Sequence, residues 1–521
     1  MLFRSGVTLK MDYPADASDN RIALMVATGE YPDLVFAKGD APTLIQNDAL
    51  IDMSDLIDEY GPNIKKLYGD EYENLRYSSD DPSIYQLCSD KVQEEILETS
   101  GTAQLQWAVL QENGYQIPYT LDEYTQMIRD YMVKYPTINE KPTIGISIAC
   151  SDWHWYTMLS NPSGFIANGS PDNGQWIVDE DKEEVYYKHA ADGQKEYYEW
   201  LNEIYNEGIL DPEFATQTHE DYIMKIADGR VLGLLDKDWD YANAEVSLRS
   251  EGQDERTYAG LPVTIDESVK CPSLKQRSLA VGWGIGITKS CKDPVRAVKF
   301  LDWICSDEGQ ILLNWGIEGV NYYYDENGKR CITEEDLEVS KSDTNYSERT
   351  GVGFRVYPFP SYGNEAVDST GNSYSKSSRN VVKESYDEME KEALKAWNAD
   401  MLIDIFPQKE EFEKENYSPL WSLTLPDELN QILSNLNDIA WKGLIDCIVC
   451  KPEDFDAKWD EMQQKLKAVG LKKADQEMTA LLRDEISRRT FPQVLVTSPL
   501  ANSSRSNASC IYESSFDRLT C

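Results

Sequence analysis

The chain has 521 residues, and its 92 acidic side chains against 50 basic ones give a formal net charge of −42. That length exceeds one compact core, so two or three domains are expected. The acidic balance disfavours nucleic acid and anionic membrane surfaces as partners, because phosphate binding needs a basic surface. It favours a neutral or cationic ligand.

Aromatic usage is uneven, with 31 Tyr and 13 Trp against 12 Phe. Tyr and Trp combine a flat apolar face with a polar edge, which suits wet binding surfaces such as sugar clefts, although ordinary packing is expected for most of them. No cofactor or metal is predicted. His154, His189 and His219 are far apart in sequence and lack a metal-binding spacing, and the pair Cys447 and Cys450 ends a helical pattern that favours core packing.

Strand and helix patterns alternate from the start of the chain. Residues 7–11 are predicted as a strand, 17–28 as a helix, 33–36 as a buried strand and 44–57 as two helices. This order is typical of a parallel sheet with helices on its faces, and it predicts an α/β fold.

Further helices, strands and turns are predicted along the rest of the chain. A helix is predicted to begin at Thr120, with Glu123 placed for a capping box. The pattern over residues 279–288 predicts a strand with Gly282, Gly284 and Gly286 on one face, which indicates that another backbone or a ligand approaches that face. Two more helices are predicted over residues 426–445 and 455–466. The sequence Asp-Glu-Asn-Gly at residues 325–328 starts like a calcium-binding loop but lacks the later ligands, so a plain turn is predicted.

Aromatic side chains gather after two predicted strands, over residues 143–149 and 231–235. In an open α/β sheet, ligands bind outside the carboxyl ends of the strands, and Trp faces stack on sugar rings. Core packing is the alternative for each of these side chains. The residues concerned are Trp153, Trp155, Trp239 and Tyr241.

Asp238 and Asp240 flank Trp239, and two interpretations of them stay open. They could hydrogen-bond the hydroxyls of a ligand, or they could be the carboxylate pair of a glycoside hydrolase, whose separation a sequence cannot measure. Trp283 lies within its predicted strand, where its side chain could equally pack in the core or bind a ligand.

A series of motifs, in this order and spacing, resembles the extracellular solute-binding proteins of ABC importers (family 1), and most closely the large lipoprotein-type carbohydrate-binding subgroup of Firmicutes. The motifs are YPDLVF at residues 31–36, LIDMSDLI at 50–57, SDDPSIY at 79–85, NGY at 113–115, PYTLDEY at 118–124, GWGIGITKSCKDPVRAVKFLDW at 282–303 and NWGIEG at 314–319.

The resemblance implies a periplasmic-binding-protein-like (type II) fold, with two lobes that are discontinuous in sequence and joined by a hinge. Residues 1–105 and 280–318 are assigned to the first lobe, and residues 106–279 and 319–486 to the second. Residues 487–521, rich in Arg and Ser, are predicted to be a disordered tail outside the family. The resemblance implies that the sequence enters at the second strand of the family, after the lipoprotein signal and lipobox of its members.

The function that the resemblance implies is capture of an oligosaccharide and its delivery to an ABC permease by a monomeric, extracellular, non-enzymatic protein. The alternatives are a secreted glycoside hydrolase that uses Asp238 and Asp240, and a purely structural surface protein. The predicted ligand-binding residues are Phe36, Lys38, Asp40, Trp107, Trp153, Trp155, Asp238, Trp239, Asp240, Tyr241 and Trp283.

Overall fold

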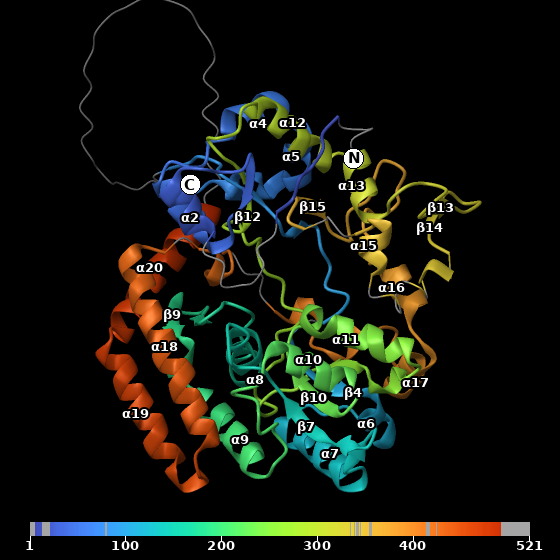
Figure 1. The fold of residues 1–521 in the computed structure, drawn as a ribbon, viewed down its shortest axis with the longest axis vertical. Coiled ribbons are helices and arrows are strands. Elements are labelled where there is room, and N and C mark those ends of the chain that lie inside the picture. Colours follow the sequence, from blue (N-terminus) through green and yellow to red (C-terminus); the bar gives the residue numbers. More distant parts are fainter. Residues whose placement is uncertain are drawn as a thin grey trace, which may run out of the picture.

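The computed structural model describes residues 6–12, 21–78, 81–99, 101–333, 335–337, 339, 343, 345–353, 357–412, 417–423 and 425–490. Buried side chains form two large hydrophobic cores, one in each of two lobes that lie one above the other in Figure 1. Each core combines segments that are far apart in the chain, so the predicted two-lobed, discontinuous architecture is confirmed.

The lobe boundaries differ from those predicted. Residues 319–486 are predicted in the second lobe, yet Phe359, Tyr362 and Tyr374 pack in the core of the first. These aromatic side chains cover the apolar residues around the first-lobe sheet, which the sequence pattern of a loop-rich segment does not reveal. The second core takes its C-terminal part from residues 417–482.

The first lobe contains a three-stranded sheet whose order is β1, β12, β2. Both pairings are antiparallel, with Val35 opposite Gly286 and Cys88 opposite Gly284. The expected parallel sheet is therefore wrong here, because the central strand returns from the second lobe instead of following a helix. The strands are β1 (Leu34–Phe36), β2 (Leu87–Cys88) and β12 (Gly284–Ile287).

The central strand has four residues, where ten were predicted, and other backbone segments closely approach the glycines in and before it. A Cβ atom on Gly282 would lie 1.9 Å from the carbonyl oxygen of Ser422, and one on Gly284 would lie 2.2 Å from that of Leu87. Glycine is required at both positions, and the prediction that another backbone approaches this face is confirmed.

Short helices surround the first-lobe sheet (Figure 1). Residues 6–12 are not a strand as predicted; the side chains of Val7 and Leu9 pack against the core instead. The predicted helix over 17–28 is present from Arg21, and residues 13–20 lie outside the described part. The helices are α2 (Arg21–Thr28), η1 (Lys38–Asp40), α3 (Ala41–Gln46), α4 (Ser54–Tyr60), α5 (Pro62–Tyr68), η2 (Gly69–Leu75), α12 (Pro294–Cys305) and α13 (Asp307–Asn314).

Smaller elements extend the first lobe or lie at the lobe junction, and α17 packs on the second lobe. The side chain of Asp325 accepts hydrogen bonds from the backbone N–H groups of Asn327 (2.9 Å) and Lys329 (2.7 Å), which confirms the predicted plain turn. The elements are β3 (Lys91–Val92), paired parallel with β15 (Ser361–Tyr362), the hairpin of β13 (Tyr323–Tyr324) and β14 (Arg330–Cys331), α15 (Tyr346–Thr350), α16 (Arg379–Ser385), α17 (Glu388–Trp397), η6 (Leu402–Ile405) and η7 (Lys409–Glu411).

The second lobe contains a four-stranded mixed sheet in the order β11, β4, β10, β7. Strands β10 and β7 run parallel, and they are the two strands after which the aromatic clusters fall. The strands are β4 (Ala103–Gln106), β7 (Ile144–Ser147), β10 (Val231–Leu235) and β11 (Tyr258–Leu261).

Helices and two hairpins enclose that sheet. The capping box predicted at Thr120 and Glu123 is present at the start of α7. The elements are α6 (Trp107–Glu112), α7 (Leu121–Lys134), the hairpin of β5 (Thr137–Ile138) and β6 (Lys141–Pro142), the π-helical turn η3 (Tyr156–Ser160), α8 (Asn161–Asn168), the hairpin of β8 (Trp176–Asp179) and β9 (Glu184–Tyr187), η4 (Lys188–Ala190), α9 (Gln194–Asn206), α10 (His219–Ala227), α11 (Asp238–Ser250) and η5 (Asp254–Arg256).

Three long C-terminal helices complete the second lobe. Cys447 is buried, and Asn202 donates hydrogen bonds to the carbonyl oxygens of Cys447 and Cys450, so this pair ends a packed helix as predicted. The last helix runs to Thr490, which extends the fold beyond the predicted limit of 486; residues 491–521 lie outside the described part. The elements are η8 (Leu420–Ser422), α18 (Asp427–Val449), η9 (Pro452–Asp454), α19 (Phe455–Ala468) and α20 (Leu471–Thr490).

A separate small hydrophobic core joins described residues from four stretches of the chain, around 97, 271–274, 382–394 and 401–406, near the lobe junction where a hinge is expected. Its members include Leu97, Cys271, Leu274, Val382, Tyr386, Met401 and Phe406. Among the described residues, no helix has the length and apolar character needed to cross a membrane.

Candidate ligand-binding site

Aromatic side chains from the two lobes meet at the lobe junction. The indole of Trp283 contacts that of Trp421 edge to face, with ring centroids 4.7 Å apart, and the ring of Phe36 lies 6.4 Å from it on the other side. Tyr357 packs edge to face on Phe36 at 5.0 Å. The ammonium of Lys38 lies 5.6 Å from the Trp283 ring centroid, a favourable cation–π position. We call Phe36, Trp283, Tyr357 and Trp421 the junction cluster.

The junction cluster joins predicted and unpredicted residues. Phe36, Lys38 and Trp283 are brought together as predicted members of one site. Tyr357 and Trp421 were not foreseen, because neither follows a predicted strand end. Trp421 stands next to Leu420, which is buried in the second-lobe core, so Trp421 belongs to the second lobe and Trp283 leads into the first-lobe sheet.

One polar atom of the junction cluster has no partner among the described residues. The indole Nε1 of Trp283 is buried and makes no hydrogen bond there, whereas the Nε1 of Trp421 donates to the carbonyl oxygen of Asp172 at 3.1 Å. A buried donor without an acceptor is costly. An acceptor supplied by a ligand, such as a hydroxyl oxygen, would satisfy it.

A charged group lies under Trp421. The carboxylate of Asp172 accepts a hydrogen bond from Asn161 at 3.1 Å and lies 3.4 Å from the ammonium of Lys237. Burial alone would raise the pKa of Asp172, but the charges of Lys237 and Lys188 lower it below its usual value. Burial lowers the pKa of Lys188 to about 8. These charged groups hold Asp172 in place, and the backbone carbonyl of Asp172 accepts the hydrogen bond from Trp421.

The strand-end residues of the second lobe divide into exposed and buried ones. Trp239 and Trp153 leave 57% and 40% of their surface exposed, so part of each indole is accessible to a ligand. Asp238, Trp239 and Asp240 form the first turn of α11, directly after β10. Asp40 is exposed at the end of η1 in the first lobe.

Three predicted site residues lie in the second-lobe core instead. Trp107 is buried and stacks on Trp397 at 6.0 Å, Trp155 is buried and stacks on Trp441 at 6.0 Å, and Tyr241 packs on another core tyrosine. Their ring faces are already covered by protein, so we leave them out of the proposed site.

Two histidines that are distant in sequence stack next to Trp153. The ring of His154 lies 3.9 Å from that of Trp153 and 4.0 Å from that of His219, and the two imidazoles are 6° from parallel. His219 Nε2 lies 3.0 Å from Oδ1 of Asp240, and this carboxylate raises the pKa of His219. Sequence separation hid this contact. The one signal in the sequence is that His154 and His219 each lie in or after a loop, and these loops meet at the same edge of the second-lobe sheet.

The geometry of α11 argues against Asp238 and Asp240 as a glycosidase pair. Asp238 and Asp240 are two residues apart on one helix, where side chains point in different directions. Asp236 is the last carboxylate before α11. It is buried and accepts a hydrogen bond from Tyr222 at 3.0 Å. Burial, and after it the charge of Asp240, raises the pKa of Asp236 well above its usual value.

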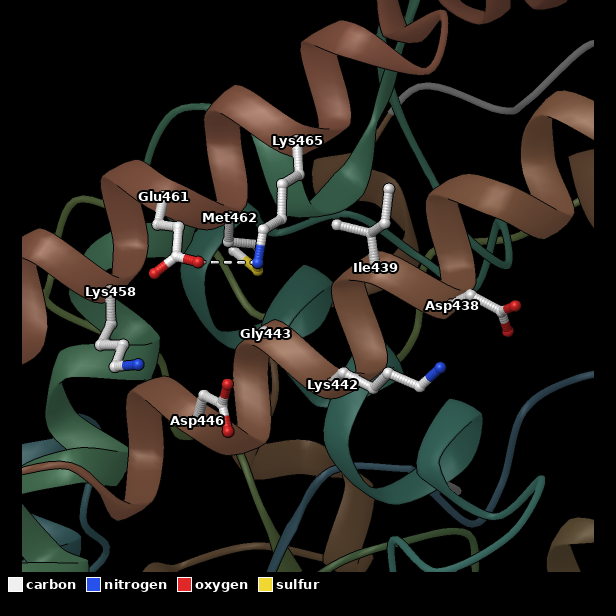
Figure 2. A pocket seen from close by; sticks show the side chains of 9 residues that line it. All are labelled: Asp438, Ile439, Lys442, Gly443, Asp446, Lys458, Glu461, Met462 and Lys465. Carbon is white, nitrogen blue, oxygen red and sulfur yellow. Dashed lines mark ion pairs between the residues drawn. The ribbon is translucent and has the colours of Figure 1, made fainter.

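A separate hollow lies between α18 and α19 (Figure 2). Its rim is formed by acidic and basic side chains, among which Glu461 and Lys465 form an ion pair of 2.8 Å. No aromatic ring lines it, so it offers no stacking surface. Its lining residues are Asp438, Ile439, Lys442, Gly443, Asp446, Lys458, Glu461, Met462 and Lys465.

Comparison with known proteins identifies the class. A family model described as bacterial extracellular solute-binding protein matches residues 4–315, and the chain belongs to this family. The fructooligosaccharide ABC transporter substrate-binding protein FusA of Streptococcus pneumoniae is 25% identical over 328 residues, 59% of this chain and 57% of that protein. Lipoprotein LipO of Bacillus subtilis is 22% identical over 338 residues, 61% of this chain and 62% of that protein. The chain thus matches less than two thirds of the length of these curated relatives.

Solved structures share the fold over nearly the whole chain. FusA in complex with kestose has a TM-score of 0.63 at 18% identity and covers 92% of this chain and 94% of its own. The alginate-binding protein AlgQ2 has a TM-score of 0.61 at 18% identity and covers 89% and 88%. The N-glycan transport solute-binding protein NgtS of Streptococcus pneumoniae has a TM-score of 0.58 at 16% identity and covers 93% of each chain.

Proposed function

We propose that this protein captures an oligosaccharide between its two lobes and delivers it to an ABC permease. The observation that carries the proposal is the junction cluster, in which Phe36 and Trp283 of the first lobe meet Trp421 of the second. Relatives named for fructooligosaccharide and N-glycan transport support a carbohydrate as the ligand class.

The chemistry of the site suits a neutral sugar. Indole faces at Trp153, Trp239 and Trp283 can stack on the apolar faces of sugar rings, and the unpaired Nε1 of Trp283 can donate to a hydroxyl oxygen. We also propose that Lys38, whose ammonium lies 5.6 Å from the centroid of the Trp283 ring, and Asp238, next to Trp239 in the chain, hydrogen-bond sugar hydroxyls. We propose that Asp40 contributes from the first lobe.

Closure is the proposed working motion. A ligand that contacts both lobes binds the closed arrangement more tightly than an open one, and this difference in affinity shifts the population toward closure. The segments near Leu97 and Leu274 would serve as the hinge. The closed form would then be the one that a permease recognises.

Membership of the family also supports a proposal about the location and the oligomeric state of the protein. We propose an extracellular, non-enzymatic monomer, attached to the membrane as a lipoprotein in its mature form, a feature that the name of LipO supports. The protein would release its sugar chemically unchanged.

Thermal unfolding with a panel of neutral oligosaccharides, kestose included, tests the proposal. We expect at least one sugar to raise the melting temperature with its concentration, since a ligand that binds the folded state alone stabilises it. Reducing-sugar assays of the same mixtures should show no cleavage. The proposal fails if no sugar shifts the transition, or if the sugar is hydrolysed.

A further inference from the structure

We propose that His154, His219 and Asp240 form a binding site for a divalent transition metal of the zinc type on the second lobe. One ligand atom from each residue lies within 4.8 Å of the others. His219 Nε2 is 3.0 Å and His154 Nε2 is 3.9 Å from Asp240 Oδ1. Two imidazole nitrogens and one carboxylate are a donor set that suits Zn²⁺ and leaves a fourth position for water or another ligand.

Burial and missing partners point to an ion at this position. The side chain of Asp240 is only 6% exposed, yet its Oδ2 makes no hydrogen bond among the described residues. His219 Nε2 lies 3.0 Å from the other oxygen, Oδ1, and is the charge partner of that oxygen. A buried carboxylate oxygen without a donor is costly, and a coordinated cation would satisfy it.

Asp152 holds one ligand in the required form. Its Oδ1 lies 2.5 Å from Nδ1 of His154 and also accepts a hydrogen bond from the backbone N–H of that residue at 2.9 Å. A proton kept on Nδ1 leaves the lone pair of Nε2 free to bind a metal. Carboxylates commonly orient metal-binding histidines in this way.

Three separate elements deliver the ligands. His219 is the first residue of α10, Asp240 lies in the first turn of α11, and His154 precedes η3. The imidazoles now stack with centroids 4.0 Å apart. Metal–nitrogen bonds of about 2.0–2.1 Å in a tetrahedral site place two nitrogens about 3.3 Å apart, and the nitrogen lone pairs of parallel rings do not converge, so binding requires the imidazoles to rotate out of their stack toward a common ion. Trp153 covers the outer face of His154, and its own exposure leaves a path for entry.

The experiment is titration calorimetry of the chelator-treated full chain with Zn²⁺. We expect one saturable site per chain. His219→Gln and Asp240→Asn should each weaken the affinity at least tenfold, and Asp152→Asn should weaken it by about 10- to 100-fold through the orientation of His154. Glu220→Gln is the matched control, because it removes an exposed charge from the same helical turn as His219 and is not a ligand, and it should keep the wild-type affinity within twofold.

Cobalt substitution separates this site from the cysteines. We expect Co²⁺ to give visible absorption bands without thiolate charge-transfer bands, since no sulfur is among the ligands. If Asp240→Asn does not fold by circular dichroism, His219→Gln decides, because the His219 side chain is partly exposed. Absence of Zn²⁺ binding by the wild type, unchanged affinity in folded His219→Gln, or thiolate bands with Co²⁺ would each overturn the proposal.

Discussion

Trp283 and Trp421 meet edge to face across the lobe junction, with ring centroids 4.7 Å apart and planes at 79°. Trp283 directly precedes the central strand of the first-lobe sheet. Trp421 is adjacent in the chain to Leu420, which is buried in the second-lobe core. Under the proposed closing motion this contact changes, so the two indoles would couple ligand binding to lobe closure.

Trp239→Ala should weaken oligosaccharide binding by about 1–3 kcal/mol, taking aromatic stacking on nucleic-acid bases as the analogue. Its indole is more than half exposed, so the substitution removes a stacking face and little packing. Trp303→Ala is the matched control, because Trp303 lies on α12 and bonds to Glu308 of the same lobe. Equal affinity of the two variants in calorimetry would remove Trp239 from the site.

Gly282→Ala should force its own segment away from Ser422, because the new Cβ would lie 1.9 Å from a backbone oxygen. Overpacking of this kind costs about 1–3 kcal/mol of stability. The shift would also part Trp283 from Trp421 and lower sugar affinity. Gly39→Ala is the control, since its Cβ would enter open space. Melting curves and calorimetry measure both effects, and identical behaviour of the two variants would refute the close approach.

Asp302→Ala should lower the free energy of unfolding by about 1.5–3 kcal/mol. Its Oδ1 accepts hydrogen bonds from the backbone N–H groups of Asn63 (2.7 Å) and Ile64 (3.1 Å), which begin α5. Loss of the carboxylate leaves these donors buried. Asp293→Ala, which removes the exposed N-cap of α12, should cost less in denaturant unfolding. A smaller loss for Asp302 than for Asp293 would contradict this explanation.

His189 should make the fold sensitive to acid. Burial, and after it the charge of Lys188, lowers the pKa of His189 well below 6.5. Below a pH of about 6.5, His189 therefore binds a proton in the unfolded chain but not in the folded chain. The free energy of unfolding falls as the pH is lowered through this range. His189→Gln should flatten the decline of the melting temperature between pH 7 and pH 5. Parallel curves for variant and wild type would show that His189 does not titrate on unfolding.

Local patterns predicted the elements that local chemistry determines. The strand over residues 231–235 and the capping box at Thr120 agree with the structure, because alternation, apolar runs and capping side chains act between near neighbours. The strand predicted over 279–288 is present only over 284–287; its first half forms turns, with backbone hydrogen bonds from Val281 to Leu279 and from Trp283 to Ala280, and Ser422 approaches Gly282 there.

The site was harder to predict than the fold. Exposed Trp239 and buried Trp107 carry the same apolar area, and only tertiary packing tells a binding face from a core face. Trp421 follows no strand, and the stacking of His154 on His219 joins residues from distant segments. Such juxtapositions leave no periodic signal in a sequence.

Calorimetric titration of the wild type and of Trp283→Ala with the oligosaccharide that most raises the melting temperature tests the central claim most directly. The account predicts saturable one-to-one binding by the wild type, at least a tenfold loss in Trp283→Ala and no such loss in Trp303→Ala. Unchanged affinity of Trp283→Ala would contradict capture of the sugar at the lobe junction.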